Sequence, residues 1–300
     1  MTGIAAGLIG ELRARHPEAV VEAAARRRRR PFLDDSGRLM LIAADHPARA
    51  ALGVRGRALA MADRRDLLRR LAAALARPGV DGVLGTADIL EDLLLLGALE
   101  GKVVVGSMNR GGLAGSAFEL DDRFTGCDAA TIAALGFDAG KMLCRICLDD
   151  PATAATLEAC GQAVTQLAGR RLVAMIEPFL ADRDGGTVRN RLTAEAVITA
   201  LSVAAGLGAT SAYTWLKVPV VPGMERVMAA TTLPALLLGG DPHGAPEETY
   251  RQWEQALALP GVRGLVVGRA LLYPPDDDVE AAVDTAAGLV RPAPALREIT

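Results

Sequence analysis

Residues 211–221 read SAYTWLKVPVV, a run of aromatic and β-branched residues around a single lysine, Lys217. This composition is typical of a buried β-strand, and burying an ammonium group costs several kcal/mol unless it is paired or neutralised. Among 33 basic residues, only Lys102, Lys141 and Lys217 are lysine. Arginine stays protonated, whereas a desolvated lysine can lose its proton and attack a carbonyl carbon. Lys217 is therefore either a nucleophile or a structural lysine that reaches solvent or an ion pair.

Seven further stretches share the short, continuous apolar character of the 211–221 strand. They cover residues 38–44, 79–85, 102–108, 139–147, 171–179, 235–239 and 261–267. Strands that are apolar along their whole length are buried on both faces, which is typical of parallel sheets. The sequence therefore predicts eight strands in one parallel sheet.

Helical patterns fill most of the gaps between these strands. They lie at about 58–76, 87–99, 128–135, 151–167, 193–205, 246–259 and 277–290. Eight alternating strands and helices predict an α/β protein with a (β/α)8 barrel, or TIM barrel. We expect residues 1–37 to form an N-terminal helical extension and residues 38–300 to form the barrel as a single domain. A doubly wound open sheet is the alternative, disfavoured by the strand count and by the lack of a GxGxxG motif after the first strand.

The overall charge argues against nucleic-acid and membrane partners. The net charge is −3, so no global field favours a polyanion. The arginine run at 26–30 closes an alanine-rich helical stretch, where cations complement the helix dipole. A nucleic-acid arm is the disfavoured alternative, because no aromatic residues interleave with these arginines. No apolar stretch is long enough to cross a bilayer, and we expect a cytoplasmic protein.

The cysteines and histidines do not predict a metal site. Cys144 and Cys147 form a CxxC pair within a predicted strand, where positions three apart point to opposite faces. No second pair of metal ligands lies nearby, so we interpret all four cysteines as small core residues. The three histidines do not form a spaced ligand set, although two of them follow predicted strands and could still meet; they are His16, His46 and His243.

Four side chains capable of acid–base chemistry lie near the ends of the predicted strands. In a barrel these ends converge on one mouth, where catalysis takes place. The four are Asp45, Lys141, Glu177 and Lys217, on the first, fourth, fifth and sixth strands. Desolvation and a neighbouring ammonium each lower the pKa of a lysine, which favours the neutral amine that forms an imine. The two carboxylates can transfer protons, or they can simply balance the charge of the lysines.

Glycine-containing turns follow the seventh and eighth strands, at Gly239-Gly240 and Gly268-Arg269. Phosphate groups bind at these two turns in many barrels, on exposed backbone amides and with charge-assisted contacts from arginine. Glycine is also common in such turns for backbone reasons alone. We expect Arg145, on the fourth strand, to contribute to substrate binding as well.

Two long charged segments are predicted to be loops, at residues 109–125 and 181–191. Long loops inside a compact α/β chain are usually functional. Arg183, Arg189 and Arg191 of the second loop could bind a substrate carboxylate, or they could be solvated charges.

The sequence resembles the class I, Schiff-base aldolases of the deoxyribose-phosphate and tagatose-bisphosphate aldolase superfamily over about residues 38–290. The motifs that carry the resemblance are LIAADH at 41–46, GFDAGKML at 136–143, IEP at 176–178, WLKV at 215–218, LLLGGD at 236–241 and GLVVGRALL at 264–272. The resemblance implies that Lys217 forms the Schiff base and that Lys141 binds substrate and lowers the Lys217 pKa. It also implies that Glu177 and Asp45 are the family's acidic residues and that the two glycine turns bind phosphate.

The resemblance implies a metal-independent carbon–carbon lyase without a cofactor, acting on a phosphorylated keto-sugar or sugar acid. One branch of these barrels is associated with inositol breakdown, which implies cleavage of 5-dehydro-2-deoxygluconate 6-phosphate to dihydroxyacetone phosphate and malonate semialdehyde. The segment VPVVPG after Lys217 lacks the acidic residues often found there, so the choice of substrate stays open. Transaldolase-like transfer and a non-catalytic sugar-phosphate-binding barrel are the alternatives. We also expect a homo-oligomer.

Overall fold

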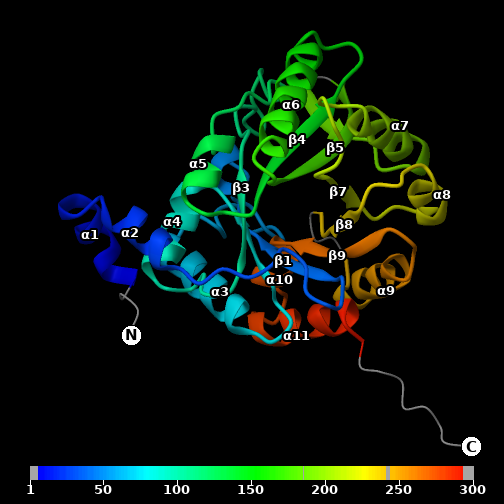
Figure 1. Cartoon of the computed structure of the whole chain (residues 1–300). Helices are drawn as coiled ribbons and strands as arrows, with labels where there is room; N and C mark the ends of the chain where they lie inside the picture. Colours follow the sequence, from blue (N-terminus) through cyan, green and yellow to red (C-terminus); the bar gives the residue numbers. More distant parts are fainter. Residues whose placement is uncertain (1–5, 185, 241–243, 293–300) are drawn as a thin grey trace, which may run out of the picture.

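Eight parallel strands close into a barrel, and helices cover its outer surface (Figure 1). The computed structural model describes residues 6–184, 186–240 and 244–292. Each strand pairs with the next in the order β1-β2-β3-β4-β5-β7-β8-β9, and β9 pairs with β1 to close the ring. The strands are β1 (Leu39–Ala43), β2 (Gly82–Gly85), β3 (Val103–Ser107), β4 (Ala139–Ile146), β5 (Val173–Asp184), β7 (Thr214–Pro219), β8 (Ala235–Leu238) and β9 (Val262–Val267). The predicted (β/α)8 barrel is confirmed, and the alternative of an open sheet is wrong.

The predicted helices between the strands are all present, with shifts of a few residues at their ends. They are α3 (Arg64–Ala76), α4 (Ala87–Leu95), α5 (Ala129–Ala134), α6 (Ala152–Ala168), α7 (Ala194–Ala205), α9 (Pro246–Leu257) and α11 (Val279–Val290). The helix expected from residue 58 begins only at Arg64, because the side chain of Asp63 caps it by accepting hydrogen bonds from two backbone amides. Two short helices were not predicted, α8 (Met224–Ala229) and α10 (Arg269–Leu272), and a 3₁₀ turn, η2 (Pro47–Arg49), follows β1.

The N-terminal extension is helical as predicted, with η1 (Ala6–Leu8), α1 (Ile9–Arg15) and α2 (Ala19–Arg26), and α2 packs beside α4 (Figure 1). The interpretation of the arginine run as helix-terminal charges holds for Arg26, in the last turn of α2, and for Arg27, its C-cap, but not for the rest of the run, which lies beyond the helix. Arg27 is buried and donates hydrogen bonds to the carbonyl oxygens of Lys102 and Gly136. Arg30 pairs with the Asp81 carboxylate. These arginines attach the extension to the N-terminal rim of the barrel.

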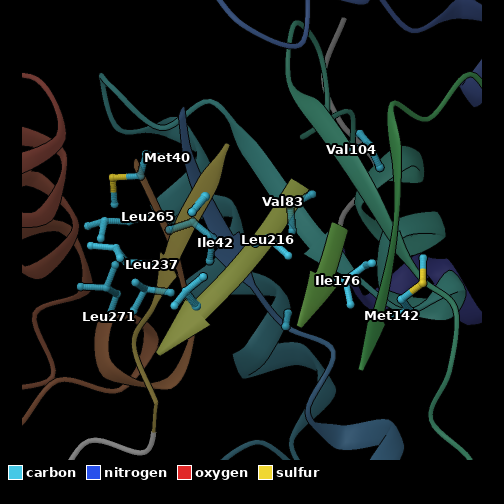
Figure 2. Packing of buried hydrophobic residues seen from close by; sticks show 14 of the residues in the cluster. Met40, Ile42, Val83, Val104, Met142, Ile176, Leu216, Leu237, Leu265 and Leu271 are labelled. Carbon is cyan, nitrogen blue, oxygen red and sulfur yellow. The ribbon is translucent and has the colours of Figure 1, made fainter. Parts of the chain in front are cut away.

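Side chains alternate between two layers along each strand, as the pleat of a β-strand requires. One set packs between the strands and the surrounding helices, and Figure 2 shows members of it such as Ile42, Ile176 and Leu216. The other set fills the inside of the barrel and includes Leu41, Val105, Ala139, Met175, Trp215 and Leu236. At the N-terminal end, Phe32 lies edge-on to Trp215 with the ring centroids 5.2 Å apart. Because apolar side chains fill the N-terminal end of the interior, the polar side chains of the interior lie at the C-terminal mouth.

The segment at 181–191 is a β-hairpin and not the loop that the sequence predicted. β5 runs on to Asp184 and pairs in antiparallel register with β6 (Thr187–Asn190). Gly186 has a φ of +88°, a left-handed conformation that tight hairpin turns require and that glycine adopts without strain. The charged side chains of this segment lack the apolar pattern of a buried strand, so the sequence did not predict that β5 extends beyond the barrel.

The four cysteines are buried and free of disulfides, which agrees with their interpretation as core residues. None of the described helices is long and apolar enough to cross a membrane.

Candidate active site

The barrel register brings the four predicted acid–base residues into the interior. Lys141 and Glu177 continue the inward-facing positions of β4 and β5, and Lys217 follows Trp215 on the inward face of β7. Asp45 follows β1 by two residues, in phase with the inward-facing Ala43. All four side chains are buried, and contacts among them form one cluster.

Glu177 joins the two lysines. Lys217 Nζ donates a hydrogen bond to Glu177 Oε1 at 2.7 Å, and Lys141 Nζ contacts Glu177 Oε2. β5 lies between β4 and β7 in the barrel, so its carboxylate can reach a lysine from each neighbouring strand. The two lysines are therefore brought together by a shared carboxylate.

Asp45 occupies the other side of Lys141. Its Oδ2 atom lies 3.2 Å from Lys141 Nζ and accepts a hydrogen bond from Ser107 Oγ at 3.1 Å. The guanidinium of Arg110 also contacts this oxygen. The second oxygen, Oδ1, is buried and has no hydrogen-bond partner among the described residues. Asp45 therefore keeps one carboxylate oxygen free of protein donors.

Sequence reasoning missed Ser107 and Arg110. Ser107 is the last residue of β3, and Arg110 opens the segment that follows this strand, so both belong to the barrel mouth. Arg110 Nε donates to Ser107 Oγ at 3.2 Å. The position of a lone arginine directly after the third strand was the signal available in the sequence.

Burial changes the ionisation of this cluster. Desolvation lowers the pKa of Lys217 below its ordinary value, with Arg110 and Arg269 acting in the same direction and Glu177 opposing them. Desolvation likewise lowers the pKa of Lys141 well below its ordinary value. Desolvation raises the pKa of Glu177, but the neighbouring lysines and Arg110 outweigh it and hold that pKa well below its usual range.

The charges of the cluster balance when one lysine is neutral. Asp45 and Glu177 supply two negative charges, and Arg110 supplies one positive charge. A single ammonium then completes neutrality, so the second lysine can be an uncharged amine at low electrostatic cost. Lys141 contacts both carboxylates, whereas Lys217 contacts only Glu177.

A cavity of about 450 Å³ opens above the cluster at the C-terminal mouth. Lys217, Glu177 and Asp45 line it, and Arg110 forms part of its wall. Lys141 is fully buried and does not line the cavity, so its ammonium supports the other groups from beneath. Asn190 of β6 also reaches the wall, which gives the 181–190 hairpin a place at the mouth.

The two glycine turns face this cavity, as the sequence predicted. Gly239, Gly240, Gly268 and Arg269 all line it. Packing alone explains the glycine at position 268, because a Cβ atom there would lie 2.1 Å from the carbonyl oxygen of Ala43. Gly240 has a φ of +62°, which favours glycine in its own right. Asp241, the end of the LLLGGD motif, lies outside the described residues.

Arg145 lines the cavity from β4 and is held by acids of the 109–125 segment. Its Nε and Nη2 atoms donate to the two oxygens of Asp122 at 2.8 and 2.6 Å. Asn109 fixes the same segment to β4 by donating from its side chain to the carbonyl oxygen of Leu143 at 2.6 Å and accepting from the Leu143 amide at 2.7 Å. This loop therefore supports the mouth, as its length suggested.

The arginines of the 181–191 segment do not line the cavity. Arg183 Nη2 lies 3.4 Å from Oδ2 of Asp150, and Arg191 donates two hydrogen bonds to the Asp182 carboxylate. Arg189 is exposed. Of the two interpretations left open for these residues, the structure agrees with surface charges.

His46 is at the cavity wall, and desolvation lowers its pKa well below the ordinary value. Its Nδ1 atom is 4.0 Å from Asp45 Oδ1. Across the described ranges, no group of three His, Cys, Asp or Glu side chains is placed to hold a metal ion. His243, the possible second histidine, lies outside these ranges.

Known proteins share both the fold and the sequence of this barrel. Residues 37–287 match the Cgl0159-like family. The crystal structure of Cgl0159 from Corynebacterium glutamicum (Brevibacterium flavum) is similar with 55% identity and a TM-score of 0.93, covering 95% of this chain and 96% of that chain. The chain belongs to the Cgl0159-like family. No curated protein matches it.

More distant solved structures share the barrel. A Schiff base-forming fructose-1,6-bisphosphate aldolase has 20% identity and a TM-score of 0.62, covering 90% of this chain and 99% of that chain. The fructose-bisphosphate aldolase from Slackia heliotrinireducens has 17% identity and a TM-score of 0.60, covering 85% of each chain. At these identities the likeness shows the fold alone.

Proposed function

We propose that this protein is a class I aldolase, a metal-independent carbon–carbon lyase that acts through an imine at Lys217. The observation that carries the proposal is the buried hydrogen bond from Lys217 Nζ to Glu177 at the floor of the mouth cavity. The ion pair with Glu177 alone would suit a structural lysine as well, but such a lysine has no need of a cavity beside it. Lys217 faces a cavity large enough for a small sugar phosphate. Its cluster is electrically neutral when one of the two lysines is an uncharged amine.

Imine formation begins with attack of the neutral Lys217 amine on the substrate carbonyl carbon. The resulting carbinolamine loses water, and this requires a proton on the departing hydroxyl oxygen. Glu177 is the group within hydrogen-bond distance of Lys217 Nζ, so it transfers a proton from the attacking nitrogen to the carbonyl oxygen. A second proton, taken up from solvent through Glu177, releases the hydroxyl as water and leaves the protonated imine. We assign the remaining positive charge to Lys141, because it contacts both carboxylates, although burial lowers its pKa well below the ordinary value.

Carbon–carbon cleavage follows from the protonated imine. A base removes the proton of the hydroxyl two carbons away from the imine carbon, the carbon–carbon bond breaks, and its electron pair moves to the iminium nitrogen as an enamine. We assign this base to Asp45, because its Oδ1 atom accepts no hydrogen bond from the described residues and the residue lines the cavity. Protonation of the enamine and hydrolysis of the imine then restore the Lys217 amine.

A phosphate group on the substrate accounts for the turns beside β8 and β9. We assign its binding to the backbone of Gly239-Gly240 and Gly268 with the Arg269 side chain, which line the side of the cavity next to Lys217. Within the class of phosphorylated keto-sugars and sugar acids, we propose 5-dehydro-2-deoxygluconate 6-phosphate as the first substrate to test, on the motif resemblance. Its cleavage would yield dihydroxyacetone phosphate and malonate semialdehyde.

The experiment is a turnover assay on a panel of phosphorylated keto-sugars and keto-sugar acids. Release of dihydroxyacetone phosphate is coupled to glycerol-phosphate dehydrogenase and followed by the loss of NADH absorbance. We expect the wild-type protein to turn over at least one member of the panel and the Lys217→Met variant to turn over no member. Turnover that persists in Lys217→Met would exclude this lysine as the imine-forming residue.

A further inference from the structure

Two arginines from separate parts of the barrel meet at one wall of the mouth cavity. Arg49 belongs to η2 after β1, and Arg145 belongs to β4. Both approach Oε1 of Glu119 at 3.4 Å, and the proximity of Arg145 adds to the effect of burial in lowering the pKa of Arg49. Two guanidinium groups side by side indicate a place where an anion is stabilised.

The acids that hold these arginines lie behind them. Arg49 and Arg145 line the cavity, whereas Glu119 and Asp122 do not. Asp122 is fully buried, and the second Glu119 oxygen accepts the backbone amide of Gly115 at 2.8 Å. The carboxylates therefore fix both guanidinium groups from the protein side. All three side-chain nitrogens of Arg145 contact Asp122 or Glu119, so Arg49 supplies the edge that remains toward the cavity.

Arg49 retains hydrogen-bonding capacity. Its Nε donates to the carbonyl oxygen of Gly112 at 3.1 Å, and its Nη2 approaches Glu119. Its Nη1 atom donates to no protein group in the part of the chain that the structure describes. An arginine with an unused donor at a cavity wall can bind a ligand oxygen without breaking a protein contact.

Arg145 lies across the barrel from the Gly268-Arg269 turn, and Arg49, which follows β1 beside β9, reaches Arg145 through their shared contact with Glu119. Arg145 is on β4, and the Gly268-Arg269 turn follows β9, which is the fourth strand from β4 in either direction around the ring. Lys217 on β7 is two strands from each. A substrate attached to Lys217 can therefore extend toward the glycine turns at one end and toward the arginines at the other.

We propose that Arg49 and Arg145 form a subsite for a carboxylate at the end of the substrate opposite its phosphate, an assignment that rests on the proposed function for the position of the reacting carbon. The planar fork of a guanidinium matches the two oxygens of a carboxylate. The charges of Arg49, Arg145, Glu119 and Asp122 sum to zero. Such a subsite supplies directed hydrogen bonds rather than net charge, which suits a monoanion better than a second phosphate dianion.

Two unreactive six-carbon probes isolate the carboxylate. 6-Phosphogluconate carries a phosphate and a terminal carboxylate, and sorbitol 6-phosphate replaces the carboxylate by a hydroxymethyl group. Neither has a keto group, so binding does not depend on the imine. Titration calorimetry on the full chain should show 6-phosphogluconate binding about ten-fold or more tightly, as a charged hydrogen bond supplies.

Variants show which residues cause the difference in affinity between the two probes. Arg49→Met removes the free donor while Arg145 stays paired with Asp122, so it should abolish the preference for 6-phosphogluconate and leave sorbitol 6-phosphate binding unchanged. Arg49→Lys keeps the charge without the fork and should restore only part of the preference. Arg269→Met should weaken both probes equally, and Arg191→Met, in the surface hairpin, should weaken neither.

Three results would overturn the subsite. These are equal affinity of the wild-type protein for the two probes, no binding of either probe, and an Arg49→Met variant that loses both probes to the same extent. Failure of the proposed function is distinguishable, because a protein that forms no imine at Lys217 would still discriminate between these two probes.

Discussion

The Glu177 carboxylate accepts a hydrogen bond from Lys217 Nζ at 2.7 Å at the base of the mouth cavity. The same carboxylate contacts Lys141 with its other oxygen. Glu177 therefore opposes the effect of burial on the pKa of Lys217 and is also the nearest group that can exchange a proton with its nitrogen. This double role makes Glu177 the first residue to vary.

Glu177→Gln should leave the shape of the site intact and remove both the negative charge and the proton-transfer group. We expect turnover to fall by about 10²–10⁴-fold, the usual contribution of a general acid–base group. Because the carboxylate raises the Lys217 pKa, its loss should shift the pH midpoint of imine formation downward. The measurement is the fraction of protein trapped by borohydride as a function of pH. An upward shift would show that Glu177 does not stabilise the Lys217 ammonium.

Lys141→Met tests the lysine that lies beneath the cavity. Removing its charge leaves Glu177 to interact with Lys217 alone, so the pKa of Lys217 should rise. The pH midpoint of imine formation should move upward by about one unit. Lys141→Arg keeps the charge and should preserve more of the low midpoint. If both variants lose turnover while the midpoint stays at the wild-type value, Lys141 is required for the reaction without tuning the pKa of Lys217.

The barrel was predictable from the sequence because its strands are apolar throughout and alternate with helices. The inward positions of Lys141, Glu177 and Lys217 follow from the same pattern, since each lies two residues from a buried apolar neighbour on its strand. The contact that joins them depends on β5 lying between β4 and β7, which is a property of the closed ring.

Arg110 and Arg49 were not assigned from the sequence. Arg110 lies in an irregular segment and Arg49 in a three-residue 3₁₀ turn, so no strand or helix periodicity tells which way either side chain points. The hairpin of β5 and β6 was missed because its charged residues lack the apolar pattern of a buried strand. The contacts of the run at 26–30 with the barrel were not predicted because its partners, such as Asp81 and the carbonyl of Gly136, are distant in sequence.

Metal removal tests whether the iminium nitrogen alone accepts the electron pair of the broken carbon–carbon bond. In the proposed reaction the iminium nitrogen accepts the electron pair of the broken bond, so a Lewis acid is not needed for that step. Turnover should survive exhaustive dialysis against EDTA. If chelation abolished turnover and added zinc restored it, the imine mechanism would have to be abandoned.

The glycines of the two turns should differ in what they contribute to stability. Gly268→Ala places a Cβ atom 2.1 Å from the backbone oxygen of Ala43, a clash that can be relieved only by moving a strand. It should lower the free energy of unfolding by about 3 kcal/mol. A Cβ atom at Gly240 meets only Leu238 Cδ1, at 4.0 Å, so Gly240→Ala should cost about 1–2 kcal/mol for its φ of +62°. Urea unfolding of the two variants checks this order, and a more stable Gly268→Ala protein would contradict the packing at β1.

Imine formation at Lys217 is tested most directly by borohydride reduction of the protein in the presence of the substrate identified in the turnover assay, or of dihydroxyacetone phosphate. The reduced protein is then analysed by intact mass and peptide mapping. We expect one stable adduct, located on Lys217 and absent from Lys217→Met. An adduct on Lys141 or Lys102 with Lys217 unmodified, or no adduct from a substrate that is turned over, would contradict it.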